Sequence, residues 1–113
     1  MKPSRGDIVT AAAGPYSSKP RPVLVIQDTG VHTGSSVVII PFTSTANSSI
    51  AERVAVKQSS LNGLDRPCWL ETDKISAIRS SAVGQTVGRL EPGLMELVEE
   101  HLGTLLGMSR RSR

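Results

Sequence analysis

The chain has 113 residues, of which 38% are hydrophobic and 20% charged, and its formal net charge at pH 7 is +3. This length and composition indicate one globular domain that can bury its own core. The single cysteine excludes an intrachain disulfide and a cysteine-rich zinc site, and the three aromatic residues argue against a module that stacks RNA bases on rings.

The first two thirds of the chain are predicted to form short strands separated by turn residues. Two continuous aliphatic runs, 23–26 and 37–40, are typical of strands buried on both faces, and the second is expected to end at Pro41. Further elements are expected in this region, namely strands at 8–12, 52–57, 68–72 and 85–87, a loop at 14–20 and a turn at Asn62-Gly63. This pattern predicts a small β-barrel or sandwich.

The end of the chain follows a helical period instead. The apolar residues that recur at spacings of four, four and three are Leu94, Val98, Leu102 and Leu105. They mark one face of an amphipathic helix that Pro92 suits as a first turn and Gly107 as a stop. We therefore predict a mainly β fold with one C-terminal α-helix, forming a single domain over residues 1–108 that is followed by a basic tail at 109–113.

Charge is distributed unevenly along the chain. Three arginines lie in the tail, and without the tail the basic and acidic residues are equal in number. Residues 1–66 carry seven basic and four acidic side chains, whereas residues 67–108 carry three basic and six acidic ones. A polyanionic partner is therefore expected to contact the first half, although the net charge alone is a weak indicator of such a partner.

The same sequence indicates where the protein works. The N-terminus lacks the apolar core of a signal peptide, and the longest aliphatic runs have four residues each, whereas a membrane helix needs about 20. The lone Cys68 fits a reducing compartment. We expect a cytoplasmic protein with no membrane partner.

Five short motifs in a fixed order carry the functional signal. They are R-G-D-I-V at 5–9, K-P-R-P-V-L-V-I at 19–26, V-I-I-P-F-T-S at 38–44, D-K-I at 73–75 and V-G-R-L at 87–90. Each motif alone is weak. The ordered set resembles the MazF/PemK family of bacterial toxin endoribonucleases over nearly the whole chain.

This resemblance implies an SH3-like barrel with a C-terminal helix, assembled as a homodimer. It also implies metal-independent cleavage of single-stranded RNA, usually mRNA, without a cofactor, and inhibition by a cognate antitoxin whose disordered segment blocks the RNA groove. By position in the motifs, the family's catalytic Arg and Thr correspond to Arg21 and Thr43. The Asp often placed near RNA corresponds to Asp73. Further substrate contacts are expected from Lys19, Ser44 and Lys74.

The chemistry of RNA cleavage suits these residue types. RNA carries its own nucleophile, the 2′-hydroxyl, so the enzyme must orient it, stabilise charge on phosphorus and protonate the leaving oxygen. The planar guanidinium of Arg21 can donate to two phosphate oxygens, and the Thr43 hydroxyl can donate to a non-bridging oxygen. Asp73 is one candidate for the general base, whose identity stays open.

Each of these residues also has a simpler interpretation. Taken alone, Arg21 between two prolines is typical of a surface arginine at a strand entrance. Thr43 is typical of a turn residue that bonds its own backbone, and Asp73 of a helix or turn cap.

Two other function classes also remain open. The same fold serves the CcdB type of toxin, which binds DNA gyrase and cleaves no RNA, and a catalytically silent RNA- or protein-binding module is a third option. The pairing of Arg21 with Thr43 favours the ribonuclease, because a gyrase binder needs no phosphate clamp. In a ribonuclease, Glu71 would repel phosphate unless it pairs with Lys74 or Arg79.

Overall fold

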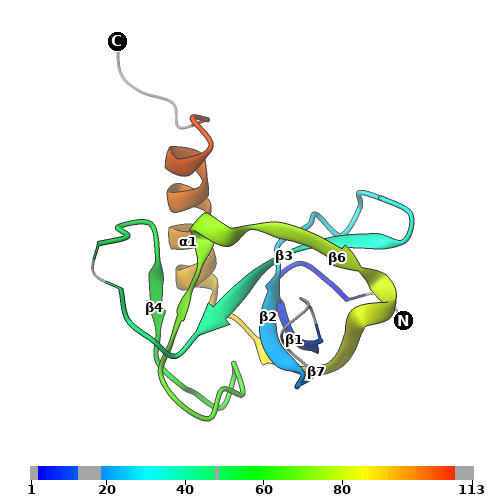
Figure 1. Cartoon of the computed structure of the whole chain (residues 1–113), viewed down its shortest axis with the longest axis horizontal. Coiled ribbons are helices and arrows are strands. Elements are labelled where there is room, and N and C mark those ends of the chain that lie inside the picture. Colours follow the sequence, from blue (N-terminus) through cyan, green and yellow to red (C-terminus); the bar gives the residue numbers. More distant parts are fainter. Residues whose placement is uncertain (1–2, 13–18, 48, 109–113) are drawn as a thin grey trace.

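The computed structural model describes residues 3–12, 19–47 and 49–108, and these residues form seven strands, two short 3-10 turns and one α-helix (Figure 1). The strands are β1 (Asp7–Ala11), β2 (Arg21–Val25), β3 (Ser36–Thr43), β4 (Val54–Val56), β5 (Cys68–Leu70), β6 (Ser76–Arg79) and β7 (Val83–Arg89). The remaining elements are the turns η1 (Thr72–Lys74) and η2 (Ser80–Ala82) and the helix α1 (Pro92–Leu105).

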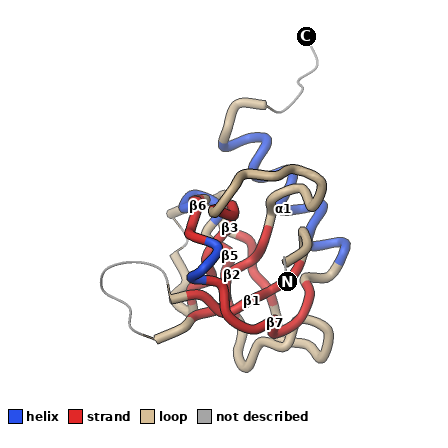
Figure 2. Tube along the Cα trace, turned by 90° about the vertical axis from the view of Figure 1, so that its right-hand side faces the viewer, coloured by secondary structure: helices blue, strands red, loops and turns tan. Residues whose placement is uncertain are grey.

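All strand pairs are antiparallel and belong to one curved sheet. Its order is β4-β5-β3-β2-β1-β7, and β6 pairs with β3 beside β5. The long strand β3 therefore pairs with two strands along one edge: Ser36–Ile39 pair with β6, and Phe42–Thr43 pair with β5. Within the described ranges no ladder joins β6 to β7, which are linked by η2, so the barrel predicted from the sequence is partly open (Figure 2).

The sheet is buried on both faces, which explains the continuous aliphatic runs. One face packs against α1, β4 and β5, and its buried residues include Ile8, Leu24, Ile40, Leu70 and Val98. The other face forms a second cluster, Val9, Ala11, Val23, Val25, Val37 and Ile39, closed by Ile78 of β6 and Val83 of β7. Successive side chains of a strand point to opposite faces, so the central strands β1, β2 and β3 contribute to both clusters.

The helix prediction is confirmed in its extent and in most of its contacts. Helix α1 stands beside β4 (Figure 1), and Val98 is fully buried while Leu94 and Leu102 pack partly buried against the same core. Leu105, predicted on the apolar stripe, is 39% exposed because it lies in the last turn, beyond that core. Gly107 has a φ of +69° at the predicted stop.

Four strand predictions need correction, the first being the strand at 52–57, which is only Val54–Val56 in the structure. Strand β3 does not end at Pro41, which pairs with Val23 and whose carbonyl accepts a 2.9 Å hydrogen bond from the backbone N–H of Glu71. Strand β5 ends at Leu70 rather than residue 72, because η1 follows, and β7 is longer than predicted. Strand β6 is absent from the prediction, since its sequence S-A-I-R holds only one large apolar residue.

Part of the predicted chain lies outside the described residues, namely most of the loop at 14–20 and the basic tail at 109–113. No helix in the described part of the chain is long and apolar enough to cross a membrane.

Candidate functional site

Arg21 and Thr43 lie at the same level of the sheet, one at the start of β2 and the other at the end of β3. The ladder between these strands pairs Val23 with Pro41. Continued by two residues, this antiparallel register places Arg21 opposite Thr43 on the same face. Thr43 in turn pairs with Trp69 of β5. Two residues more than 20 positions apart in sequence are thus neighbours because of strand pairing.

Both residues line a cleft of about 680 Å³ beside the start of β2 and the end of β3. Its lining includes the predicted site residues Lys19, Arg21, Thr43 and Ser44, together with Leu64, Asp65, Arg66, Cys68 and Glu71. Arg21 is exposed and Thr43 is half-buried. The structure therefore brings four of the six predicted site residues together.

The other two predicted residues lie beside this cleft. Lys74 lines an adjoining cleft of about 460 Å³, which shares Arg21 and Glu71 with the first. Asp73 lines neither of these two clefts. Its carboxylate accepts hydrogen bonds from Arg53, at 3.0 Å from Nε and 3.4 Å from Nη2.

Thr43 also shows the turn behaviour expected of it in isolation. Its Oγ1 accepts a hydrogen bond of 3.2 Å from the backbone N–H of Thr45, which fixes the side chain relative to the turn that follows β3. A hydroxyl that accepts one bond can still donate its own proton. The turn interpretation and a donor role are therefore compatible.

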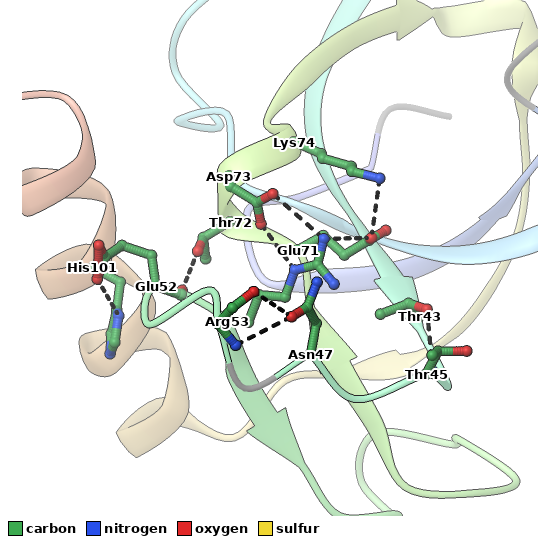
Figure 3. Close-up of polar contacts among 11 residues, drawn as sticks. Thr43, Thr45, Asn47, Glu52, Arg53, Glu71, Thr72, Asp73, Lys74 and His101 are labelled. Atoms are coloured by element: carbon green, nitrogen blue, oxygen red, sulfur yellow. Dashed lines mark hydrogen bonds and ion pairs between the residues drawn. The ribbon is translucent and has the colours of Figure 1, made fainter.

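An ion-pair network borders the cleft, drawn in Figure 3. The Arg53 guanidinium contacts Glu71 Oε2 at 3.1 Å and Asp73 Oδ1 at 3.0 Å, and Lys74 Nζ lies 3.5 Å from Glu71 Oε2. The predicted pairing of Glu71 with Lys74 is confirmed. The pairing with Arg53 was not predicted, and Arg79 instead lies opposite Ser36 in the β3–β6 ladder.

Arg53 is the functional residue that sequence reasoning missed. The β4–β5 ladder pairs Val54 with Leu70 and Ala55 with Trp69. One further step places Arg53 opposite Glu71. The only signal in the sequence was the alternation of 52–57, which does not say which strand is the partner.

The contact between Arg53 and Asp73 shifts the pKa values of both groups. The hydrogen bond from Arg53 outweighs burial and holds the pKa of Asp73 below its usual range. The same hydrogen bond, against the effect of burial, raises the pKa of Arg53. Both groups are therefore charged at neutral pH. Burial raises the pKa of the Cys68 thiol in the cleft wall, so this cysteine is protonated at neutral pH and a poor nucleophile.

The arrangement is suited to a phosphodiester. A permanently charged planar donor and a neutral hydroxyl donor face one open cleft, with Lys19 in the same lining. Among the described residues no group of three or more His, Cys, Asp or Glu side chains is placed to hold a metal ion. These side chains can bind and orient a phosphate by hydrogen bonds and charge.

Comparison with known proteins yields one consistent family. The model of the PemK-like, MazF-like toxins of type II toxin–antitoxin systems matches residues 4–106. A probable endoribonuclease MazF of Mycolicibacterium smegmatis is 37% identical over 106 residues, which cover 93% of this chain and 97% of that protein.

Solved structures share the fold. An endoribonuclease from a mycobacterial species, in complex with its cognate antitoxin, has a TM-score of 0.79 at 24% identity and covers 97% of this chain and 100% of its own. The toxin MazF-mt6 of Mycobacterium tuberculosis has a TM-score of 0.77 at 25% identity, covering 92% and 99%. The chain belongs to the family of PemK-like, MazF-like toxins of type II toxin–antitoxin systems.

Proposed function

We propose that this toxin is an endoribonuclease that cleaves single-stranded RNA, with mRNA as its main target, by attack of the 2′-hydroxyl and without a metal ion. The observation that carries the proposal is the placement of Arg21 and Thr43 at one level of the sheet, in the lining of one cleft. The relative from Mycolicibacterium smegmatis, named a probable endoribonuclease, supports the reaction class.

In this reaction the 2′-oxygen bonds to the adjacent phosphorus and the bond from phosphorus to the 5′-oxygen breaks. The products are a 2′,3′-cyclic phosphate and a free 5′-hydroxyl, with water in the open cleft accepting the 2′-hydroxyl proton and supplying a proton to the leaving 5′-oxygen. Arg21 donates to two non-bridging oxygens, Thr43 donates to one of them, and negative charge builds on these oxygens in the transition state. Lys19 and Ser44 line the same cleft and bind neighbouring parts of the RNA backbone.

The proton of the 2′-hydroxyl needs an acceptor. Asp73 is poorly suited, because the hydrogen bond from Arg53 lowers its pKa and because Asp73 lies outside the cleft lining. The Arg21 guanidinium offers only N–H donors and no acceptor, so it cannot serve. We keep Asp73 as a residue near the RNA backbone, held in place by Arg53, rather than as the base.

The test is cleavage of a long single-stranded RNA by the purified protein in excess EDTA. We expect discrete fragments that end in 2′,3′-cyclic phosphate. A short RNA with a single 2′-deoxy nucleotide on the 5′ side of the cleaved bond should resist cleavage at that bond. Cleavage of the deoxy substrate, or activity only when a divalent metal is added, would contradict the mechanism. Intact RNA with folded protein would shift weight to the gyrase-binding or silent-module alternatives.

We further propose that the toxin works in the cytoplasm as a homodimer and is inhibited by a cognate antitoxin. A related endoribonuclease has been solved in complex with its own antitoxin, which supports the partner class. The basic first half of this chain, with seven basic and four acidic residues in 1–66, suits an acidic and disordered inhibitor.

A further inference from the structure

Glu71 is an unexpected residue in the wall of a cleft that is proposed to bind phosphate. It lines both the Arg21–Thr43 cleft and the adjoining cleft. An uncompensated carboxylate at this position would repel each phosphate that enters. In the β3–β5 ladder Glu71 lies two residues from Trp69, the partner of Thr43. It is therefore a diagonal neighbour of Thr43 on the same face, about 7–8 Å away in such ladders.

Arg53 is placed to cancel this charge. One residue beyond the pair Val54–Leu70, the β4–β5 register places Arg53 opposite Glu71, and its guanidinium lies 3.1 Å from Glu71 Oε2. The Arg53 side chain is only 8% exposed and that of Glu71 12% exposed, so solvent screens this pair weakly. The second cation on Glu71, Lys74, is 60% exposed and 3.5 Å away, and it is the weaker partner.

Asp73 fixes the orientation of Arg53. Two nitrogens of the guanidinium, Nε and Nη2, donate to the two oxygens of Asp73 at 3.0 and 3.4 Å. A planar fork held in this way cannot turn freely. The same Nη2 that contacts Asp73 also contacts Glu71. The charge of Arg53 is thus directed to the cleft wall.

We infer that Arg53 is a positioning residue that acts through Glu71: it neutralises the acidic wall of the cleft and so sets the affinity for RNA. This inference rests on the proposed function, because it takes RNA phosphate as the occupant of the cleft. It assigns no bond-making role to either residue. The pair controls how tightly substrate binds and leaves the rate of the chemical step nearly unchanged.

Three variants separate this role from a structural one: Arg53→Met, Glu71→Gln and the double variant. Arg89→Met is the matched control. It also removes one arginine and its ion pair, here with Asp7, and Arg89 is not among the residues that line the cleft. The readouts are KM and kcat for RNA cleavage, Kd for a short RNA at two salt concentrations, and thermal unfolding by circular dichroism. Activity is measured well below the melting temperature of each variant.

We expect Arg53→Met to raise KM and Kd about tenfold to thirtyfold, as one unscreened charge near a phosphate would do, with kcat within about threefold. Glu71→Gln alone should lower Kd, because it leaves the positive charges of Arg53 and Lys74 without their shared carboxylate in the cleft wall. The double variant should recover wild-type KM to within about threefold. The Arg89→Met control should match the wild type in KM and kcat.

Four results would overturn the inference. Three concern RNA affinity: an unchanged affinity in Arg53→Met, a double variant that binds as weakly as Arg53→Met, and binding by Glu71→Gln that is no tighter than in the wild type. The fourth is a loss of kcat of about a hundredfold or more in Glu71→Gln, which would mean that Glu71 contacts the reacting atoms. If Arg53→Met does not fold, the Kd of Glu71→Gln tests the inference by itself: tighter RNA binding than in the wild type supports it, and equal or weaker binding overturns it. Failure of the wild type to bind or cleave RNA would refute the proposed function instead, and it is seen before any variant is compared.

Discussion

Replacing Asn62 by Ala should destabilise the protein strongly. Asn62 is fully buried, with 0% exposure. Its Nδ2 donates to the Lys57 carbonyl at 2.9 Å and to the Glu91 carboxylate at 3.3 Å. Its Oδ1 accepts from the backbone N–H groups of Ser59 and Leu64, each at 3.0 Å. One side chain therefore ties the turn after β4 to the start of α1.

The magnitude follows from the groups left without a partner. Truncation to Ala leaves the buried N–H group of Leu64 unpaired, together with two part-buried groups, the N–H of Ser59 and the carbonyl of Lys57. At about 1–3 kcal/mol for each unsatisfied group, and with some entry of water, the loss is about 4 kcal/mol. A typical domain has only about 5–15 kcal/mol of stability, so the variant should be marginal at 37 °C.

The assay is urea denaturation followed by circular dichroism, comparing the free energy of unfolding of Asn62→Ala with that of the wild type. Asn47→Ala is the control. Asn47 is exposed and its Oδ1 accepts a 3.1 Å bond from the backbone N–H of Ser49, so its loss should cost less than about 1 kcal/mol. A loss below about 1 kcal/mol in Asn62→Ala would refute the reasoning, because the buried amide would then not hold the turn.

Three further changes test other parts of the structure. Asp73→Asn should flatten the pH dependence of stability. Arg53 lowers the pKa of Asp73 in the folded protein. The ionised Asp73 therefore stabilises the fold above the unfolded-state pKa of about 3.9, and this stabilisation is lost as pH falls through the lower folded-state pKa. Urea titrations from about pH 6 to about pH 3 measure the free energy of unfolding, and the same pH dependence in Asp73→Asn and wild type would contradict this prediction. Leu102→Ala should lower the free energy of unfolding by about 2 kcal/mol, the low end for Leu→Ala since Leu102 is only partly buried against the core; an unchanged melting temperature would exclude this packing. Cys68 should react with a maleimide at least about tenfold more slowly in the native protein than in urea, because burial raises the pKa of the thiol; equal rates would show an accessible thiolate.

The elements that sequence could predict are those whose signal is local. The runs 23–26 and 37–40 are strands because branched aliphatic side chains suit a sheet that is buried on both faces. The helix is set by the spacing of Leu94, Val98 and Leu102, which falls on one face whatever the rest of the chain does. Gly63 adopts a φ of +69° at the predicted turn, where a Cβ would lie 2.2 Å from the Val87 carbonyl oxygen.

The parts that could not be predicted depend on long-range pairing. Strand β6 exists because the edge of β3 offers partners such as Val37 for Ile78, and nothing in S-A-I-R indicates it. Pro41 continues a strand because proline lacks only the backbone N–H. Its carbonyl remains and accepts the hydrogen bond from the backbone N–H of Glu71. The Arg53–Glu71 pair depends on the β4–β5 register, which the sequence does not reveal.

The candidate site divides in the same way. Lys19, Arg21, Thr43 and Ser44 were found through motifs, and the structure places them in one cleft lining. Other lining residues, among them Leu64 and Cys68, come from a loop and a strand with no motif of their own. Their contribution to the cleft follows from the pairing of β5 with the end of β3.

The most direct test of the account is the single-turnover cleavage rate of one short RNA by the wild type, Arg21→Ala and Thr43→Ala, with Arg89→Met as the folded control. Loss of one preorganised donor typically lowers the rate about a hundredfold to a thousandfold. The account predicts a loss of this size in both site variants at saturating protein, with circular dichroism spectra unchanged and the control at wild-type rate. Wild-type rates in either folded site variant would contradict the claim that these two side chains act on the same phosphate.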